Sequence, residues 1–434
     1  MSTPANKLFK KALKMHNARD LKGAAGIYQK IIRSEPGHID ALYMLGTLKA
    51  EQADLVPALD LLLQAAALAP HSPMIQNNLG NVYMKSAQLD EAARCYQRAL
   101  LQKPNMPESH FNLASIYLRQ EKFSAAVQGF ETAATLKPDF YQAHFSLGNL
   151  YRTLGDCLMA IRSFRNAVAL APNSSNALYG LANALAANHD WEEATVCFHQ
   201  LLELNPADES AKFALAALRG ETPTMAPHVH VKGIFNDLAG NFDSHLAQLD
   251  YRIPELLRDV MLNISGPNAH FSNCIDLGCG TGISGAAFRP YTQRISGVDL
   301  SGKMIAIARN KEIYDDLSEE GLIEYLERTD ELFDLVLATD VLVYLGELSA
   351  LFAEIKRRTM AGAHFLFSTE RSDDADYVLQ PSGRYAHSPA YIANLAAEFD
   401  FTIKHSNPVK IRMEKDVPLM GDIFVLSRNN TPSS

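Results

Sequence analysis

Six prolines recur at a fixed interval of 34 residues through the first half of the chain. They are Pro36, Pro70, Pro104, Pro138, Pro172 and Pro206. A fixed period of this length indicates a repeated supersecondary unit that buries its apolar face against its neighbours. Residues 1 to about 220 are therefore predicted to fold as a helical repeat array.

Other positions keep the same register as the prolines. Small residues recur at Ala12, Gly46, Gly80, Ala114, Gly148, Ala182 and Ala216, and again at Ala24, Ala58, Ala92, Ala126, Ala160 and Ala194. Bulky residues recur at Tyr28, Leu62, Tyr96, Phe130, Phe164 and Phe198. Small side chains let two helices approach closely, bulky ones fill the seam, and each proline ends the second helix of a pair.

This register resembles the tetratricopeptide repeat family over residues 1–220. The resemblance implies an all-α solenoid of six repeats, followed by a capping helix from Glu209 to Arg219 that covers the last apolar face. The array departs from the family pattern at its start, where Ile31 and Lys49 replace a small and an aromatic residue. The first repeats are therefore expected to pack less regularly.

The resemblance also implies a concave groove that binds a protein or peptide. First helices carry Asn78, Asn81, Asn112, Asn149 and Asn183 at positions that resemble the groove-lining face. An asparagine amide can donate to and accept from the backbone of an extended peptide. Asparagine at these positions is also common in the repeat family whatever its members bind, so a purely structural role stays open.

The stretch from Gly220 to Pro227 contains prolines and threonines and breaks the helical periodicity. It is predicted to be part of an interdomain linker at residues 221–230. The second domain is then expected at residues 231–430.

The second domain contains the segment CIDLGCGTG, from Cys274 to Gly282. An apolar run bounded by glycines is typical of a buried parallel strand that turns into a helix. Glycine lets the backbone pass close to a ligand. The dinucleotide fingerprint needs a further glycine at position 283, which is Ile283 here, so the spacing departs from a nicotinamide site.

Asp276 and the glycines at 278, 280 and 282 together resemble motif I of the class I S-adenosylmethionine-dependent methyltransferases. A second predicted strand ends at Asp299, whose carboxylate could accept hydrogen bonds from both ribose hydroxyls. Taken singly, these features also fit a tight turn and a surface acid. The resemblance implies a cofactor site at Asp276, Gly278, Cys279, Gly280, Gly282, Asp299, Leu300, Met304, Glu320 and Asp340.

Two of these residues are assigned to the cofactor site because of their positions in the predicted sheet. Glu320, or its neighbour Glu319, stands where the family has an acid that contacts adenine. Asp340 follows the fourth predicted strand at the crevice where ligands bind in doubly wound sheets. It is therefore either close to the transferred methyl group or a cap for the next helix.

The fold class implied by the resemblance is a Rossmann-like α/β methyltransferase domain with a seven-stranded sheet. The fifth strand is expected at residues 362–369 and the last two at 401–404 and 422–426, separated by a long excursion through Pro408 and Pro418. Before the first strand, helices at 234–246 and 249–257 are expected to cap the cofactor pocket. Tyr251 and Arg252 could reach the methionine carboxylate, or could simply pack at the helix start.

Residues 380–388 form a polar segment with Arg384, Tyr385 and His387. This segment is predicted either to flank the methyl acceptor or to be a solvated connection. Methyl transfer depends mainly on alignment, and a base matters only for a protonated acceptor, so Asp340, Tyr385 and His387 are the candidate catalytic residues. The segments at 344–346 and 383–388 make the whole chain resemble bacterial tetratricopeptide-repeat proteins with a C-terminal class I methyltransferase domain.

The composition narrows the choice of partners. The 434 residues carry a formal net charge of -9 and show no basic run, which argues against a general nucleic-acid binder. The five cysteines have no metal-ligand spacing and are expected to be reduced, with Cys279 packed beside the cofactor. No signal peptide or apolar membrane span is visible, so a cytoplasmic location without membrane contact is predicted.

Two functions remain open from the sequence. The first is a methyltransferase that acts on a protein or small molecule, with the repeats recruiting a partner or substrate. The second is a repeat-based interaction scaffold whose methyltransferase domain binds the cofactor but is inactive. The absence of an NPPY segment after strand four argues against a nucleobase amino group as acceptor, and the absence of a cysteine after strands four and five argues against carbon-5 methylation of pyrimidines.

Overall fold

The computed structural model describes residues 4–373, 375–414 and 417–430. Met1–Thr3, the start of the predicted repeat region, lie outside this range. The described chain divides into two compact units, residues 1–188 and 189–434. This division falls within the sixth predicted repeat, whereas the predicted repeat domain extends to residue 220.

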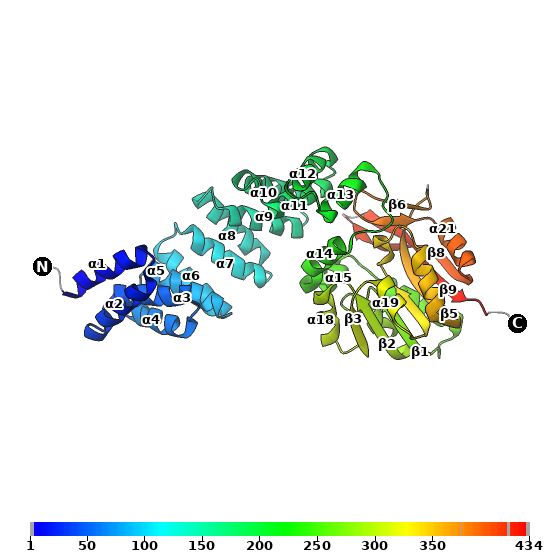
Figure 1. Cartoon of the computed structure of the whole chain (residues 1–434), viewed down its shortest axis with the longest axis horizontal. Helices are drawn as coiled ribbons and strands as arrows, with labels where there is room; N and C mark the ends of the chain where they lie inside the picture. The colour runs from blue at the N-terminus through cyan, green and yellow to red at the C-terminus, as the bar shows by residue number, and fades with distance from the viewer. Residues whose placement is uncertain (1–3, 374, 415–416, 431–434) are drawn as a thin grey trace. The chain divides into compact units, whose positions relative to one another are not determined.

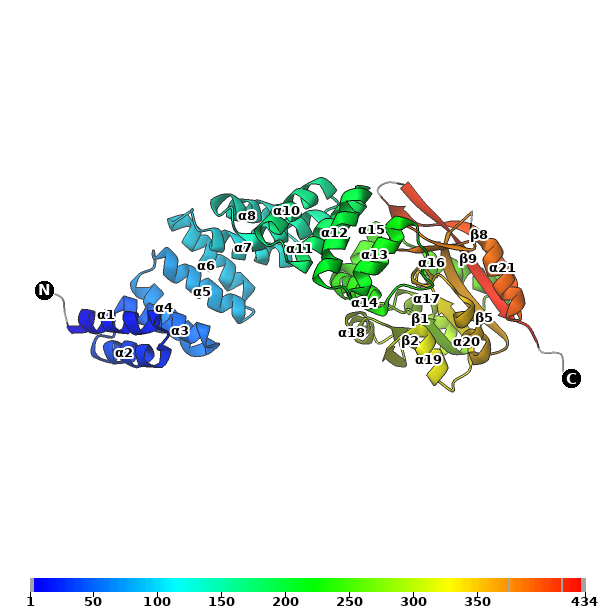
Figure 2. The same cartoon turned by 45° about the horizontal axis from the view of Figure 1, so that its top comes forward.

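The repeat region consists of antiparallel helix pairs with regular lengths. The helices are α1 (Pro4–Asn17), α2 (Leu21–Ser34), α3 (Ile39–Glu51), α4 (Leu55–Leu68), α5 (Pro73–Lys85), α6 (Leu89–Gln102), α7 (Pro107–Arg119), α8 (Phe123–Leu136), α9 (Tyr141–Thr153), α10 (Cys157–Leu170), α11 (Ser175–Ala187), α12 (Trp191–Leu204) and α13 (Glu209–Arg219). Figure 2 shows α1 to α11 following one another as successive hairpins. The six pairs and the capping helix α13 agree with the sequence prediction.

The recurring small and bulky residues form the helix seams. A Cβ atom added to Gly80 would lie 2.8 Å from the Tyr96 ring, and one added to Gly148 would lie 2.7 Å from Phe164. These glycines are therefore required by close packing. The first repeats share the regular helix lengths, and Ile31 is fully buried beside Tyr28, so the expected irregularity at this end is not observed.

The segment predicted as a free linker is bound to the C-terminal domain. We call residues 222–226 the strap. Thr224 O accepts hydrogen bonds from Gly346 N and Glu347 N, Ala226 N donates to Tyr344 O, and Met225 forms an antiparallel bridge with Leu345. Helix α14 (His228–Leu238) begins two residues later. The linker prediction is therefore corrected, because these backbone hydrogen bonds fix the segment in place.

The C-terminal domain is built on one sheet with helices on both faces (Figure 1). The strands are β1 (Phe271–Leu277), β2 (Thr292–Asp299), β3 (Asp316–Glu319), β4 (Phe333–Ala338), β5 (Thr359–Arg371), β6 (Tyr377–Leu379), β7 (Tyr385–His387), β8 (Phe401–Glu414) and β9 (Val417–Arg428). Strands β3-β2-β1-β4-β5 are parallel neighbours in this order, and β9 joins β5 antiparallel and carries β8 at the edge. The carboxyl ends of β1, β2 and β4 therefore meet at one edge.

The helices cover the two faces with apolar side chains. They are α14, α15 (Phe242–Gln248), α16 (Ile253–Ser265), α17 (Ile283–Phe288), α18 (Gly302–Asn310), α19 (Leu322–Arg328), α20 (Ser349–Arg358) and α21 (Pro389–Glu398). One core contains Leu257 of α16, Phe288 of α17 and Leu335 of β4. The other contains Leu326 of α19, Phe352 of α20 and residues of α21. No helix in the described residues is long and apolar enough to cross a membrane.

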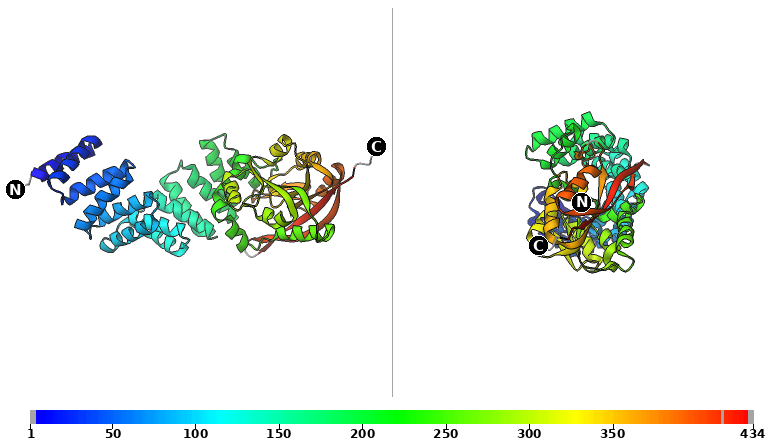
Figure 3. Two further views of the ribbon diagram at one scale, coloured as in Figure 1. Left: turned by 90° about the horizontal axis from the view of Figure 1, so that it is seen from below. Right: turned by 90° about the vertical axis from the view of Figure 1, so that its right-hand side faces the viewer.

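The sheet differs from the predicted one in two places. The described residues form nine strands, because the predicted polar loop at 380–388 contains β7, which pairs with β6 and with the end of β5. The expected excursion through Pro408 and Pro418 is instead the long hairpin of β8 and β9, drawn in orange and red in Figure 3. Proline is tolerated in β8 because an edge strand need not use every N–H group in a ladder.

Candidate functional site

The glycine loop after β1 requires a backbone that other residues rarely adopt. Gly278, Gly280 and Gly282 all have positive φ, at 74°, 53° and 95°. A Cβ atom added to Gly278 would lie 2.5 Å from Val341, whereas one added to Gly280 would meet only Phe242, at 3.8 Å. The first glycine is therefore packed against the loop after β4, and Gly280 faces open space.

Asp299 connects the glycine loop to the end of β2. Its Oδ2 accepts a hydrogen bond from Gly280 N at 2.9 Å, and its Oδ1 accepts one from Ser301 N at 2.8 Å. The side chain is only 8% exposed, and burial raises its pKa above the usual range. A carboxylate oxygen accepts more than one hydrogen bond, so both oxygens can still accept from a hydroxyl group.

A cavity of about 320 Å³ lies where the glycine loop, Asp299 and the loop after β4 meet. Helices α14, α15 and α19 and the strap complete its walls. The lining residues are Met225, Ala226, His228, Val231, Phe235, Phe242, Leu246, Tyr251, Gly278, Cys279, Gly280, Thr281, Ile283, Ser284, Asp299, Leu300, Leu322, Ile323, Glu324, Glu327, Thr339, Asp340, Val341, Tyr344 and Leu345. The volume suits a small-molecule ligand.

The structure brings six of the predicted cofactor residues into this lining. They are Gly278, Cys279, Gly280, Asp299, Leu300 and Asp340. The other four are not among the lining residues. Gly282 is the N-cap residue of α17, and the fully buried Met304 lies in α18. Glu320 pairs with Arg328 at 2.7 Å.

Asp276 is fully buried beneath the glycine loop. Its Oδ2 accepts a hydrogen bond from the Tyr314 hydroxyl at 2.6 Å, while Oδ1 has no hydrogen-bond partner among the described residues. Burial raises the pKa of Asp276 to about 7, and the charge of Asp299 adds to the effect. Asp276 therefore holds Tyr314, whose ring lies 3.1 Å from a Cβ atom added to Gly282.

The pKa of Asp276 predicts a pH-dependent stability. Between about pH 4 and 7 the folded state holds a proton that the unfolded state has released, so the free energy of unfolding falls as pH rises through this window. Asp276→Asn removes this titration, so its stability relative to the unsubstituted protein should increase across the window, by about 1.4 kcal/mol per pKa unit. Urea unfolding at several pH values measures the difference. Parallel pH profiles of the two proteins would contradict the prediction, and Glu320→Gln serves as a control at a half-buried acid outside the cavity.

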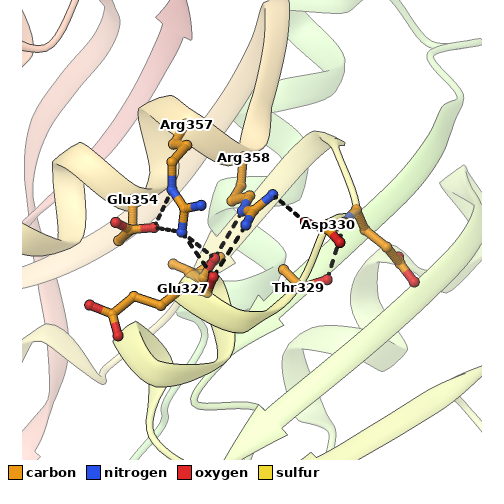
Figure 4. Close-up of polar contacts among 8 residues, drawn as sticks. Glu327, Thr329, Asp330, Glu354, Arg357 and Arg358 are labelled. Atoms are coloured by element: carbon orange, nitrogen blue, oxygen red, sulfur yellow. Dashed lines mark hydrogen bonds and ion pairs between the residues drawn. The ribbon is translucent and has the colours of Figure 1, made fainter.

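Two acids of α19, Glu324 and Glu327, line the cavity where the sequence analysis expected Glu320. Arg357 and Arg358 hold the end of this helix by donating to the Leu326 and Glu327 carbonyl oxygens at 2.9–3.2 Å (Figure 4). Both acids lie on one helix face because they are three residues apart. That spacing was visible in the sequence, but the choice of helix face was not.

Asp340 stands at the end of β4 in a strained conformation, with φ at 52°. Its N–H donates to Ser368 Oγ at 2.9 Å. Its Oδ1 pairs with Arg384 at 2.7 Å and with Arg412 at 3.4 Å, and both arginines also reach Glu370, at 2.6 and 3.2 Å. Sequence reasoning missed Arg412 and Glu370, which come from distant strands.

Tyr385 and His387 are fully buried and absent from the lining of the cavity. The Tyr385 hydroxyl donates to Pro223 O of the strap at 2.9 Å, and His387 Nε2 bonds to Gly346 O at 3.0 Å. Burial lowers the pKa of His387 to about 4, so the ring is neutral near pH 7. This geometry favours a role in holding the strap and the loop after β4 over direct contact with an acceptor.

Tyr251 lines the cavity, while Arg252 does not. Burial raises the pKa of Tyr251 well above its usual value, and the charge of Asp340 contributes. The tyrosine therefore lies at the end of the cavity that Asp340 occupies. Among the described residues, no group of three or more His, Cys, Asp or Glu side chains is arranged to hold a metal ion.

A second hollow, of about 390 Å³, lies on helices α3, α5, α6 and α7 of the N-terminal unit. Its lining includes Asn78, Asn81 and Asn112, together with Thr47, Ala50, Glu51, Met84, Lys85 and Tyr96. Asn78 donates to Tyr43 and Thr47, and Asn112 donates to Asn81 Oδ1. Asn149 and Asn183 are not among the lining residues. The groove residues predicted from the sequence are thus brought together only in part.

Family models match two parts of the chain. A methyltransferase domain model matches residues 275–367, and tetratricopeptide repeat models match residues 77–139, 113–175 and 159–218.

The curated relatives include two malonyl-[acyl-carrier protein] O-methyltransferases. That of Serratia marcescens is 29% identical over 141 residues, 32% of this chain and 52% of the relative. That of Yersinia pestis is 32% identical over 95 residues, 22% of this chain and 35% of the relative. The chain thus spans about half the length of the first relative and about a third of the second.

Two solved structures each match part of the chain at low identity. The N-methyltransferase NodS from Bradyrhizobium japonicum WM9, in complex with S-adenosyl-L-homocysteine, is 18% identical with a TM-score of 0.38, covering 46% of this chain and 99% of that one. YrrB, a tetratricopeptide protein with an unusual peptide-binding site, is 19% identical with a TM-score of 0.39, covering 43% and 96%. On the family models, the chain carries tetratricopeptide repeats over residues 77–218 and a C-terminal methyltransferase domain over residues 275–367.

Proposed function

We propose that this chain is an S-adenosylmethionine-dependent methyltransferase whose repeat domain recruits a protein partner or substrate. The observation that carries the proposal is the meeting of Gly280, Asp299 and Asp340 in one cavity. Three chain segments that are distant in sequence supply these residues. A tight turn or a surface acid alone would not explain their convergence.

The residues fit the cofactor. Gly280 leaves its side of the loop open, since an added Cβ would meet only Phe242 at 3.8 Å, and Asp299 offers a buried carboxylate to the ribose hydroxyls. Glu324 and Glu327 could accept from the adenine amino group. When bound, S-adenosylmethionine supplies a methyl group that is already activated by its positive sulfur.

The chain's own residues then position the acceptor and exclude water. Phe235 of α14, Phe242 of α15 and Leu246 form an apolar wall, and Thr281 hydrogen-bonds to Asp243 of α15. This contact ties α15 to the glycine loop. Asp340 lines the same cavity, and its carboxylate is held by Arg384 and Arg412. Alignment of this kind accounts for most of the rate in transfer from an activated donor.

The relatives' acceptor, a malonyl carboxyl group on an acyl-carrier protein, is a second candidate for this chain. A carboxylate acceptor would need a basic partner in the cavity. The described lining contains no lysine or arginine. This candidate is therefore less well supported.

The proposal is tested by titration calorimetry with S-adenosylhomocysteine and NAD. Binding of the first and no binding of the second supports it, whereas the reverse contradicts it. An inactive scaffold is the alternative function. It would bind S-adenosylhomocysteine and fail to transfer radiolabelled methyl groups to any fraction of a cell lysate.

The repeat domain is proposed to bind its partner through the hollow at Asn78, Asn81 and Asn112. Replacing all three with alanine should reduce partner capture about tenfold or more, because amide hydrogen bonds to a peptide backbone are lost. Cross-linking in lysate measures capture. The matched control is Asn149→Ala with Asn183→Ala, which lie outside the hollow. Equal capture by both variants would contradict the assignment, and thermal melting of each checks that the repeats remain folded.

A further inference from the structure

We infer that the methyl acceptor is an amine whose nitrogen is recognised by Asp340 and by a neighbouring aromatic cluster. We define this cluster as Phe235, Phe242 and Tyr344. The inference rests on the proposed function, because it assigns the second substrate of the same cavity. It is argued from charge, hydrogen bonding and aromatic geometry.

The charges that line the cavity have one sign. Among the described residues the lining contains the carboxylates of Asp299, Glu324, Glu327 and Asp340 and no lysine or arginine. His228 is paired with Glu324 at 3.9 Å. A set of carboxylates in a partly enclosed site attracts cations and repels anions. Asp299, Glu324 and Glu327 are assigned to the cofactor, so Asp340 is the lining carboxylate left for the acceptor, and its charge disfavours an anionic one.

Asp340 is a paired carboxylate that borders the cavity. Arg384 and Arg412 donate to its Oδ1, at 2.7 and 3.4 Å. The side chain is 21% exposed and lines the cavity. The two arginines also contact Glu370, so the four charges balance. The arginines therefore fix the carboxylate at the border of the cavity, where it can accept from an N–H donor of a ligand.

The arginines do not replace this carboxylate as the contact for an acceptor. Arg384 lies between Asp340 and Glu370, and Arg412 is only 4% exposed. Neither belongs to the cavity lining. A carboxylate acceptor would have to displace Asp340 from a paired cluster, which leaves a partly buried charge without its partner.

The aromatic cluster is the second feature that is inferred to contact the amine. The Phe235 ring is 6.0 Å from Phe242 and 5.4 Å from Tyr344, at interplanar angles of 72° and 79°. All three residues line the cavity with Asp340. These distances and angles are those of edge-to-face packing, so the three rings form one continuous aromatic wall of the cavity. Arg384 lies over the Tyr344 ring at 5.8 Å, and the phenylalanine rings remain as aromatic surface that attracts an ammonium group.

Methyl transfer to an amine accounts for every bond, electron pair and proton in the reaction. The acceptor binds as an ammonium ion and first releases one proton to water. The neutral nitrogen then attacks, forming an N–C bond to the methyl group as the S–C bond breaks and its electron pair goes to sulfur. The positive charge passes from the sulfur to the methylated nitrogen. Asp340 accepts a remaining N–H of the nitrogen, which directs the lone pair away from the carboxylate.

The test uses the full chain saturated with S-adenosylhomocysteine and three probes with a common phenylalkyl body. They are 2-phenylethylamine, 2-phenylethanol and 3-phenylpropanoate. Titration calorimetry should give the amine roughly tenfold to a hundredfold tighter binding than the alcohol, the range for a hydrogen bond to a charged group. The propanoate should bind more weakly than both.

Asp340→Asn should reduce the preference for the amine over the alcohol to within a few-fold, and Glu320→Gln, outside the cavity, should leave it intact. Three results would overturn the inference: equal binding of amine and alcohol, tighter binding of the propanoate, or no amine binding at millimolar concentration. If S-adenosylhomocysteine itself does not bind, the proposed function fails. If it binds and the amine is not preferred, only the acceptor assignment fails.

Discussion

Replacing Asp299 with alanine is expected to lower the affinity for S-adenosylhomocysteine by roughly tenfold to several hundredfold. A hydrogen bond to a charged group contributes about 1.5–3 kcal/mol, and about 1.4 kcal/mol corresponds to tenfold in affinity. The carboxylate is also the acceptor for Gly280 N and Ser301 N, so its removal frees the glycine loop as well. Titration calorimetry of the purified full-length variant measures the loss.

A matched pair of controls separates recognition from folding. Asp299→Asn keeps one acceptor oxygen and should lose less affinity than the alanine variant. Glu320→Ala removes an acid of the same domain that pairs with Arg328 outside the cavity, and it should bind as the unsubstituted chain does. Unchanged affinity of a folded Asp299→Ala protein would show that the ribose lies elsewhere.

Replacing Gly280 with valine is expected to weaken the same binding by roughly tenfold to a hundredfold, the range for inserting methyl groups into a filled space. The residue has φ at 53°, and its side chain would project into the cavity, because an added Cβ meets only Phe242, at 3.8 Å. The two valine methyl groups would then occupy volume that the cofactor needs. Calorimetry and thermal melting are measured on the same preparation.

Backbone strain is the competing explanation for such a loss. Gly362→Val tests it, because Gly362 has φ at 81° and has no neighbour within 4 Å of an added Cβ. This control should lose stability by a similar amount, since a left-handed backbone costs about 1–2 kcal/mol for a side chain with a Cβ. It should retain cofactor affinity. If Gly362→Val loses affinity to the same extent as Gly280→Val, strain rather than filling of the cavity is responsible.

The sequence by itself determined the two domain types and the central motif. The 34-residue register places Tyr96 and Phe164 against glycines because each repeat has the same local geometry. The glycine loop could also be predicted, because the sequence has three glycines within five residues. In the structure all three adopt positive φ, which glycine does most readily. Asp299 followed from its place at the end of a strand. These features depend on spacing along the chain, which a sequence displays directly.

Only the tertiary structure decided which side chains meet. Arg412 reaches Asp340 from 72 residues away through the β8–β9 hairpin, and Tyr385 is buried because its hydroxyl meets the strap, 162 residues before it. Glu324 and Glu327 line the cavity from one face of α19, whereas Glu320 precedes this helix and pairs with Arg328. Such contacts depend on strand order and on helix rotation about its axis. The apolar pattern along the chain indicates that an element has a buried face, but it gives neither the strand order nor the elements that this face contacts.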